Sequence, residues 1–324
     1  IMGTLDSVYF IDVTDPKKPK LVDAEAGRAS RTIHRDFKTY KHYCYAVADE
    51  GNSSLQIFDL SYLPDSVHKV YDADRHVSRA HNIFVDNKKL YLGTCRDRRG
   101  EIIPMRILSL ENPEEPSRLL DVYGPDIGGT SLFREVHDMF VADDTIYCST
   151  GDDGLYTLKY SEDSIEKNNT DSTWIELRPK TELLNWGAIV SYPGKGYNHS
   201  SWLSSNSRYL AMADETHGTK LKMIELFWDD IPKVLSTFGV SAGDGSIPHN
   251  PFIHKKKVYI SYYHEGVVVF DIENPKEPRL IAQYDTYPDN TDFKGMYGCW
   301  GVYPFLPSGN IIASDQLHGL FVFN

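Results

Sequence analysis

Residues 80–94, AHNIFVDNKKLYLGT, hold the unit from which the fold can be predicted. Ile83 and Val85 precede the polar turn DNKK, and Leu90 and Leu92 follow it, which is typical of two short β-strands. His81 stands directly before the first strand. The arrangement returns in REVHDMFVADDTIYCST, YNHSSWLSSNSRYLAMAD, IPHNPFIHKKKVYISYY and, more loosely, TIHRDFKTYKHYCYAVAD. A strand pair headed by histidine is therefore the repeated element of this chain.

The spacing of these heading residues indicates the architecture. They are His34, His81, His137, His199 and His249, with Trp300 in the equivalent place, at separations of 47, 56, 62, 50 and 51 residues. A third strand follows in each unit, such as SLQIFDL, MRILSL or GVVVFDI, and most units add a fourth, such as SRLLDVY. Four antiparallel strands repeated every 40 to 60 residues or so predict an all-β fold, a β-propeller of four-stranded blades.

The number of blades follows from an irregularity at the amino end. The stretch SVYFIDVTDPKKPKLVDAE has the pattern of a third and a fourth strand, and the chain closes on the third strand GLFVFN. We expect one propeller domain over residues 1–324 with seven blades, in which residues 1–30 supply the outer strands of a further blade. A six-bladed ring that uses the amino-terminal hairpin for closure is the alternative.

Composition narrows the classes of partner. The chain has 34 Lys and Arg against 46 Asp and Glu, a net charge of −12, which would repel a phosphate backbone. We expect no nucleic-acid partner, and no membrane span, because no long apolar run occurs. A monomer is expected. The four cysteines have no CxxC spacing, so we expect mostly buried thiols and leave any pairing open.

Several stretches, taken together and in order, resemble one family of bacterial proteins. They are MGTLDSVYFIDVTDPKKPKLV, SLQIFDLSYL, AHNIFVD, NHSSWLSSNSRYLAMADE and WGVYPFLPSGNIIASDQLHGLFVF. The chain is similar through them to the choice-of-anchor B family of surface propellers, related to LVIVD-repeat proteins. The resemblance implies a propeller that is extracellular or displayed on the cell surface, and it implies no reaction.

The heading residues are the candidate binding site. The first strand of a propeller blade lines the central channel, so we expect these side chains to converge at the channel mouth: His34, His81, His137, His199, His249 and Trp300. Imidazoles can bind a divalent metal ion, for which we single out His81, His137 and His249, or act as acid and base. The alternative is a structural latch in which each histidine bonds to backbone carbonyls.

Acidic residues follow the second strands, in pairs such as Asp49-Glu50 and Asp214-Glu215. We expect them to stabilise turns, mainly on the face opposite the histidines. No nucleophile elbow or HExxH helix is present. The preferred hypothesis is therefore a binding or scaffold module for a protein, a glycan or a small ligand. The alternative is a hydrolase or lyase that uses the histidine site, with or without a metal.

Overall fold

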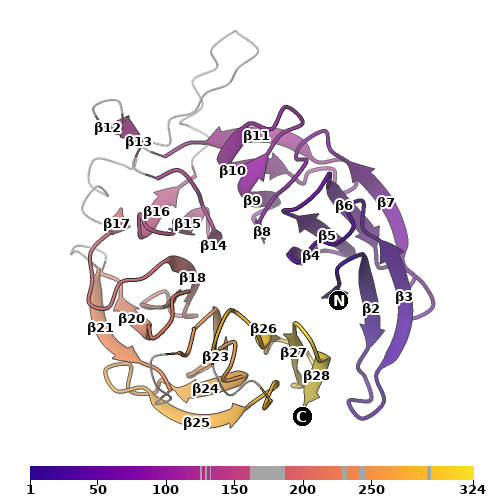
Figure 1. Ribbon diagram of the computed structural model, residues 1–324. Coiled ribbons are helices and arrows are strands. Elements are labelled where there is room, and N and C mark those ends of the chain that lie inside the picture. The colour runs from indigo at the N-terminus through magenta and orange to yellow at the C-terminus, as the bar shows by residue number, and fades with distance from the viewer. Residues whose placement is uncertain are drawn as a thin grey trace. The chain divides into compact units, whose positions relative to one another are not determined.

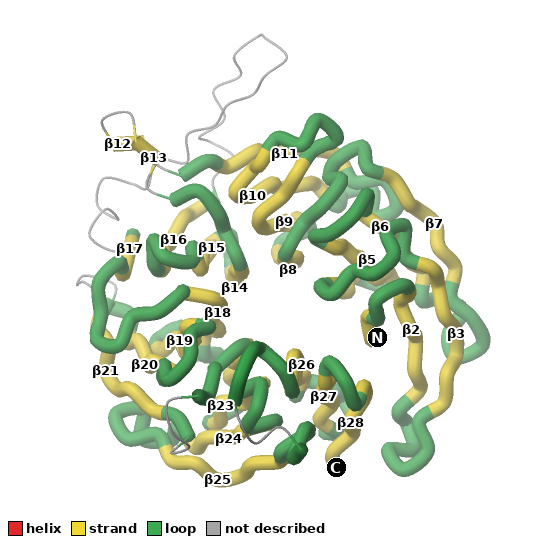
Figure 2. The backbone as a smooth tube through the Cα atoms, in the orientation of Figure 1, coloured by secondary structure: helices red, strands yellow, loops and turns green. Residues whose placement is uncertain are grey.

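The computed structural model describes residues 1–124, 126–127, 130–131, 133–160, 187–227, 232–240, 245–289 and 293–324. In these ranges the chain forms strands joined by turns and loops, without helix (Figure 2). Consequently none of the described residues forms a helix able to cross a membrane. The strands make seven successive antiparallel sheets and one small hairpin (Figure 1). The fold is a seven-bladed β-propeller, as the repeat predicts.

The chain divides into two compact units. The first holds residues 1–150 and, within the described chain, residues 157–160. Its strands are β1 (Met2–Gly3), β2 (Ser7–Asp12), β3 (Lys20–Ala26), β4 (Arg35–Tyr40), β5 (Tyr43–Ala48), β6 (Leu55–Asp59), β7 (His68–Ala73), β8 (Asn82–Asp86), β9 (Lys89–Arg96), β10 (Ile102–Ser109), β11 (Ser117–Val122), β12 (Asp126–Ile127), β13 (Thr130–Ser131), β14 (Asp138–Ala142) and β15 (Thr145–Ser149). Their sheets are β1-β2-β3, β4-β5-β6-β7, β11-β10-β9-β8 and the hairpin β12-β13.

The second unit holds residues 151–156 and the described residues from 187 onward. Strand β16 (Leu155–Lys159) contains the division, in the sheet β14-β15-β16-β17. The strands that follow are β17 (Ala188–Ile189), β18 (Asn198–Leu203), β19 (Tyr209–Asp214), β20 (Leu221–Glu225), β21 (Lys233–Phe238), β22 (Asn250–His254), β23 (Lys257–Ser261), β24 (Val267–Asp271), β25 (Arg279–Tyr284), β26 (Cys299–Tyr303), β27 (Ile311–Asp315) and β28 (Gly319–Phe323). They form the sheets β18-β19-β20-β21, β22-β23-β24-β25 and β26-β27-β28.

The first strands of the blades begin beside the heading residues of the repeat. Strands β4, β8, β14, β18, β22 and β26 each start within one residue of a heading histidine or of Trp300. The amino-terminal strands form a sheet of their own, with Met2 opposite Tyr9 and Ser7 opposite Ala26. The six-bladed alternative is therefore wrong, because β2 and β3 belong to a separate blade to which β1 adds a short inner strand.

Tight turns join the first and second strands of a blade. Asn87 and Lys88 connect β8 to β9, and both have positive φ, at 43° and 59°. Asp143 and Asp144 do the same between β14 and β15, at 48° and 59°. Two consecutive residues of positive φ make a type I′ turn, whose twist matches that of the paired strands. In these two blades the polar turns of the repeat are thus two-residue hairpins, whereas the longer loop 204–208 joins β18 to β19.

The second strands are buried on both faces, and their alternating side chains serve two interfaces. In β5 all six residues are buried. Cys44 and Ala46 pack with Val8 of the preceding sheet, whereas Tyr45 packs with Ile83 of the following one. Successive side chains of a strand point to opposite faces, so one strand joins the cores on either side of its blade.

Candidate functional site

The backbone of the heading residues determines where their rings lie. The amide N–H of His81 donates to the carbonyl of Gly93 at 3.0 Å, and that of His137 donates to Ser149 at 2.8 Å. His249 does the same to Ser261 at 3.1 Å. These three histidines therefore each extend the ladder between the first and second strands by one position, whereas the His34 amide donates to Oε2 of Glu50 at 3.2 Å. Antiparallel pairing also brings the end of the second strand back to the histidine.

This register corrects the expectation that the acidic residues lie on the opposite face. Arg35 pairs with Ala48, so Asp49 emerges next to the start of β4. Asn198 pairs with Asp214, which places Glu215 beside the start of β18. An antiparallel second strand ends where the first one begins, so its exit lies on the histidine side.

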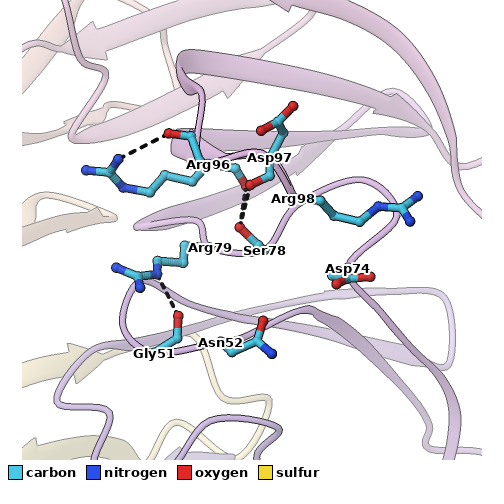
Figure 3. Close-up of a pocket in the computed structure, with 9 residues that line it drawn as sticks. Gly51, Asn52, Asp74, Ser78, Arg79, Arg96, Asp97 and Arg98 are labelled. Carbon is cyan, nitrogen blue, oxygen red and sulfur yellow. Dashed lines mark hydrogen bonds between the residues drawn. The ribbon is translucent and has the colours of Figure 1, made fainter.

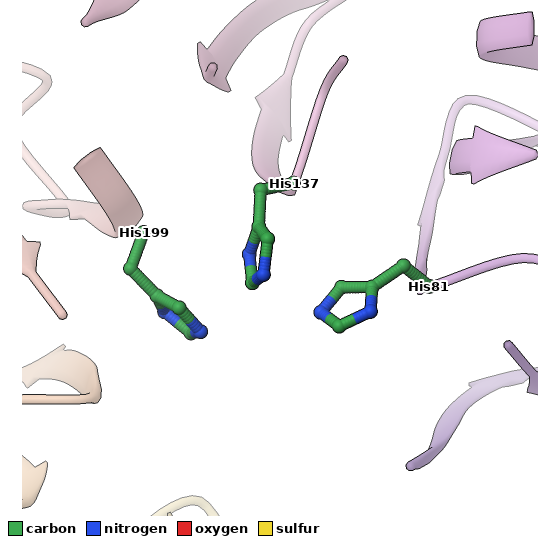
Figure 4. Close-up of side chains that lie close together, drawn as sticks. All are labelled: His81, His137 and His199. Atoms are coloured by element: carbon green, nitrogen blue, oxygen red, sulfur yellow. The ribbon is translucent and has the colours of Figure 1, made fainter. Parts of the chain in front are cut away.

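The first unit contains a group that we call the His81 cluster: His34, Asp49, His81 and His137. Nδ1 of His81 lies 2.5 Å from Oδ2 of Asp49. The His34 ring stacks on the His81 ring at 3.9 Å and 13°, and the His137 ring lies 4.0 Å from His81 at 52°. Figure 4 shows the His81 and His137 rings extending from the starts of β8 and β14 toward one another; His199, also drawn there, belongs to the second unit.

Electrostatics in the His81 cluster favour bound protons. Burial alone would lower the pKa of His81, but the hydrogen bond and charge of Asp49, with the charges of Asp138 and Asp36, outweigh it and raise the pKa. Burial, followed by the charge of Asp36, raises the pKa of Asp138 to about 7. Asp49 therefore favours the proton on Nδ1 of His81, so that Nε2 of the neutral ring is the atom that can bind a ligand or accept a proton.

The second unit contains the His249 cluster: His199, Glu215, His249, Tyr263 and Trp300. His199 and His249 are buried, with ring centroids 4.3 Å apart. Nε2 of His199 lies 3.7 Å from Oε2 of Glu215, and Nε2 of His249 lies 3.7 Å from its Oε1. One carboxylate thus faces two imidazoles from consecutive blades.

Two aromatic side chains complete the His249 cluster. The hydroxyl of Tyr263 donates to Oε1 of Glu215 at 2.5 Å, and burial together with this carboxylate raises the pKa of Tyr263. The Trp300 ring lies 5.0 Å from the His249 ring and 6.0 Å, at 87°, from the Tyr263 ring. The aromatic heading residue therefore forms a wall of this cluster.

Both clusters have donor atoms suited to a transition metal. The ligand atoms of His34, Asp49 and His81 lie within 4.8 Å of one another, as do those of His199, Glu215 and His249. Zinc bonds to imidazole nitrogen and carboxylate oxygen at about 2.0–2.2 Å, which separates tetrahedral ligands by about 3.4 Å. The two 3.7 Å separations at Glu215 are close to this value.

The predicted site residues are divided between the two compact units. His34, His81 and His137 belong to the first unit, and His199, His249 and Trp300 belong to the second. The metal trio of His81, His137 and His249 therefore stays a prediction. Sequence reasoning missed Asp49, Glu215 and Tyr263 as site residues, although the antiparallel order of strands would have located the two carboxylates.

Two of the other acidic residues that follow second strands, Asp97 and Asp315, stabilise their own turns. Oδ1 of Asp97 accepts the amides of Arg99 and Glu101, and Oδ1 of Asp315 accepts those of Leu317 and His318. The turn interpretation is confirmed for these two, and it is wrong for Asp49 and Glu215, whose carboxylates face histidines.

The four cysteines are free and buried. Burial raises the pKa of Cys44 and of Cys95 to about 12, so neither is a thiolate at neutral pH. The expectation of buried thiols is confirmed.

Comparison with known proteins supports the propeller fold but assigns the chain to no family. No family model matches the chain, and no curated protein sequence does. The periplasmic gluconolactonase PpgL of Pseudomonas aeruginosa superposes with a TM-score of 0.67 at 11% identity, over 99% of this chain and 92% of that one. A provisionally assigned 6-phosphogluconolactonase of Bacteroides fragilis gives 0.63 at 11% identity, over 97% and 85%. A computationally designed protein gives 0.56 at 9% identity, over 98% and 90%.

These likenesses carry information about architecture only. Structures with so little sequence identity can share a propeller while their sites differ, because function depends on the residues placed on a fold. The computationally designed protein also superposes on nearly the whole chain, so this degree of likeness reflects the architecture and not a shared function. The chain is thus similar in fold to propellers that include lactonases.

Proposed function

We propose that this protein is a ligand-binding β-propeller whose His249 cluster holds a divalent transition-metal ion. The observation that supports this most directly is the carboxylate of Glu215, which lies 3.7 Å from an imidazole nitrogen of His199 and 3.7 Å from one of His249. The three donors come from two blades and are enclosed by protein, with both histidines at most 4% exposed. Two imidazoles and one carboxylate are an established zinc ligand set.

Such a metal would retain a position for an external ligand. Three protein donors leave the fourth tetrahedral position open to an atom of a protein, a glycan or a small molecule. Tyr263 would orient Glu215 through its 2.5 Å hydrogen bond, as groups behind metal ligands commonly do. Trp300 offers an aromatic face beside the open position. The cluster would therefore capture a donor atom and an apolar or sugar face together.

The setting we propose is outside the cell. The ordered succession of segments that resembles choice-of-anchor B proteins supports a secreted or surface-displayed protein. Protease treatment of intact native cells would test this, since an exposed protein is digested without lysis. Persistence of the protein until lysis would contradict surface display, and its absence from the culture medium would contradict secretion.

Metal analysis tests the binding function. The purified protein, stripped with chelator and titrated with Zn²⁺ by calorimetry, should bind one ion in the His249 cluster. His249→Ala and Glu215→Gln should each weaken that binding at least tenfold, since each removes one of three donors. His217→Ala is the matched control, because His217 is an exposed histidine of the same unit. Equal zinc affinity in all four proteins would refute the proposal.

A hydrolase is the second candidate, and the His81 cluster favours it. The 2.5 Å contact between His81 Nδ1 and Asp49 is the arrangement of a general base held by a carboxylate. The lactonase names of two similar propellers suggest a cyclic ester as substrate. Nε2 of His81 would take a proton from water as the water oxygen attacks the lactone carbonyl. The ring C–O bond would then break, and its oxygen would take up the proton to give a hydroxy acid.

Turnover of gluconolactone, followed by acid release at constant pH, tests this candidate. Asp49→Asn should lower kcat with little effect on KM, because it removes the orienting charge without touching the substrate. His42→Ala is the control, an exposed histidine of the same unit that lies 3.9 Å from Asp59. A rate equal to the uncatalysed one in the wild type, or an unchanged kcat in Asp49→Asn, would remove the hydrolase from consideration.

A further inference from the structure

A separate pocket on the first unit is lined by arginines. Its volume is about 340 Å³, and it lies between the loop at Gly51 and the segments at Ser78 and Arg98 (Figure 3). This volume falls at the lower end of the range for small-molecule sites. Three arginines line it, Arg79, Arg96 and Arg98, in a protein whose net charge is −12. The pocket therefore concentrates positive charge on an acidic molecule.

The backbone holds two of these arginines side by side. Arg79 and Arg96 form an isolated antiparallel bridge, with the Arg96 amide donating to the Arg79 carbonyl at 2.9 Å. The Ser78 hydroxyl donates to the Arg96 carbonyl at 3.1 Å and reinforces the bridge. Figure 3 shows both guanidinium groups on one side of the pocket. Like charges on directly paired residues repel, and an anion between the two guanidinium groups would relieve that repulsion.

The neutral contacts of the two guanidinium groups leave donors available. Nε of Arg79 donates to the Gly51 carbonyl at 2.6 Å, and Nη1 of Arg96 donates to the Gly100 carbonyl at 3.4 Å. Among the residues that the structure describes, no carboxylate lies within 4.0 Å of the side-chain nitrogens of Arg79, Arg96 or Arg98. The side chains of Arg79 and Arg96 are thus each held to a backbone carbonyl through one nitrogen, which leaves their other N–H groups to donate to a ligand.

The two carboxylates that line the pocket are already engaged. Oδ1 of Asp97 accepts the amides of Arg99 at 2.7 Å and Glu101 at 3.0 Å. Oδ2 of Asp74 pairs with Arg28 at 3.5 Å. Asp97 therefore bonds to its own turn and Asp74 to an arginine outside the pocket, and neither forms an ion pair with Arg79 or Arg96.

We propose that this pocket binds a small molecule through an oxyanion, a carboxylate or a phosphate, held between Arg79 and Arg96. Guanidinium forks match the two oxygens of either group and form charge-assisted hydrogen bonds with them. Arg98, which is exposed, adds charge that attracts the anion. The pocket is independent of the histidine clusters and of any metal in them.

Calorimetric titration at low ionic strength tests the pocket with three defined ligands: inorganic phosphate, galacturonate and neutral galactose. Phosphate or galacturonate should bind and galactose should not, and the stronger of the two anions identifies the oxyanion class. Raising the salt to about 0.2 M should weaken binding, because the pocket is open to solvent. Absence of binding by both anions would overturn the proposal.

Variants locate the binding. Arg96→Gln should weaken it about tenfold, the loss expected for one charge-assisted contact. Arg79→Gln should weaken binding by a similar factor. Because Arg79 also bonds to Gly51, the circular dichroism spectrum of this variant is first compared with that of the wild type to show that the loop is intact. Arg96→Lys, which keeps the charge without the fork, should restore only part of the affinity. Arg118→Gln is the control, an exposed arginine of the same unit outside the pocket. Equal affinity in Arg96→Gln and wild type would refute the site.

Discussion

The ion pair between Lys222 and Asp214 offers a sharp test of how the second unit is held together. Both side chains are fully buried, and Nζ of Lys222 lies 2.7 Å from Oδ2 of Asp214. The same nitrogen donates to the carbonyl of Gly194 at 2.8 Å. Asp214 further accepts the hydroxyl of Tyr192 at 2.8 Å and the amide of Gly196 at 2.9 Å. The pair ties the loop before β18 to strands β19 and β20.

The loss of stability in Lys222→Met follows from the buried Asp214 carboxylate that remains without its lysine. Removing one partner of a buried pair costs about 3–5 kcal/mol, because the other charge stays buried. Tyr192 and Gly196 still donate to Asp214, so we expect a loss near 3 kcal/mol in the free energy of unfolding. The double variant Lys222→Met/Asp214→Asn carries no buried charge. Its loss should be smaller than the sum of the two single losses by about 2 kcal/mol or more.

Urea unfolding followed by tryptophan fluorescence measures these losses through the midpoint and the slope of the transition. Arg208→Met, in the turn directly before β19, is the matched control. Arg208 lies 2.7 Å from Glu225, but its side chain is 59% exposed, so water screens the pair and its loss should be much smaller than that of Lys222→Met. Asp214 also accepts Nδ2 of Asn198 at 3.3 Å, next to His199. Lys222→Met should therefore weaken zinc binding as well.

Two results would refute this reasoning. A free energy of unfolding for Lys222→Met within about 1 kcal/mol of the wild type would mean that the buried carboxylate is satisfied without its lysine. Strict additivity of the single variants would mean that the two charges do not stabilise one another.

Two further predictions concern pH and backbone conformation. Because burial and Asp36 raise the pKa of Asp138 to about 7, its protonated form is favoured in the folded state. The free energy of unfolding should therefore decrease by about 1–4 kcal/mol as the pH rises from about 4 to 7. In Asp138→Asn the midpoint of urea unfolding should change less with pH over that range. Gly266→Ala should cost several °C in melting temperature, because at φ 76° its Cβ would lie 2.0 Å from the Tyr284 carbonyl oxygen. Gly309→Ala, at φ 82° in open space, should cost less; equal losses would contradict the steric argument.

The clusters illustrate where inference from the sequence stopped. The five histidines could be found because they stand at one position of a repeat. The antiparallel order of the strands would have placed Asp49 on the histidine side, but its role could not be predicted, because an Asp after a strand also has the composition of an ordinary turn. Its 2.5 Å contact with His81 joins residues 32 positions apart on neighbouring blades. Only the packing of one blade against the next creates that contact.

The arginine pocket depends even more on tertiary structure. Arg96 is one of several charged residues in the segment CRDRRG, and Arg79 lies in another blade connection. No pattern along the chain distinguishes them from a solvated surface. Their bridge, together with the engagement of Asp97 and Asp74 elsewhere, is what leaves positive charge facing the pocket.

The sequence by itself determined the fold class and the first-strand positions, and the structure decided for seven blades over six. The fold class and the first strands depend on local chemistry. Alternating apolar residues, polar turns and a repeat of 47 to 62 residues specify strands and hairpins wherever they occur. Tertiary structure alone decided which carboxylate faces which histidine, which arginines share a pocket and which lysine is buried with Asp214. Those pairings join residues far apart in the chain, and they exist only once the blades have packed and water has been excluded from between them.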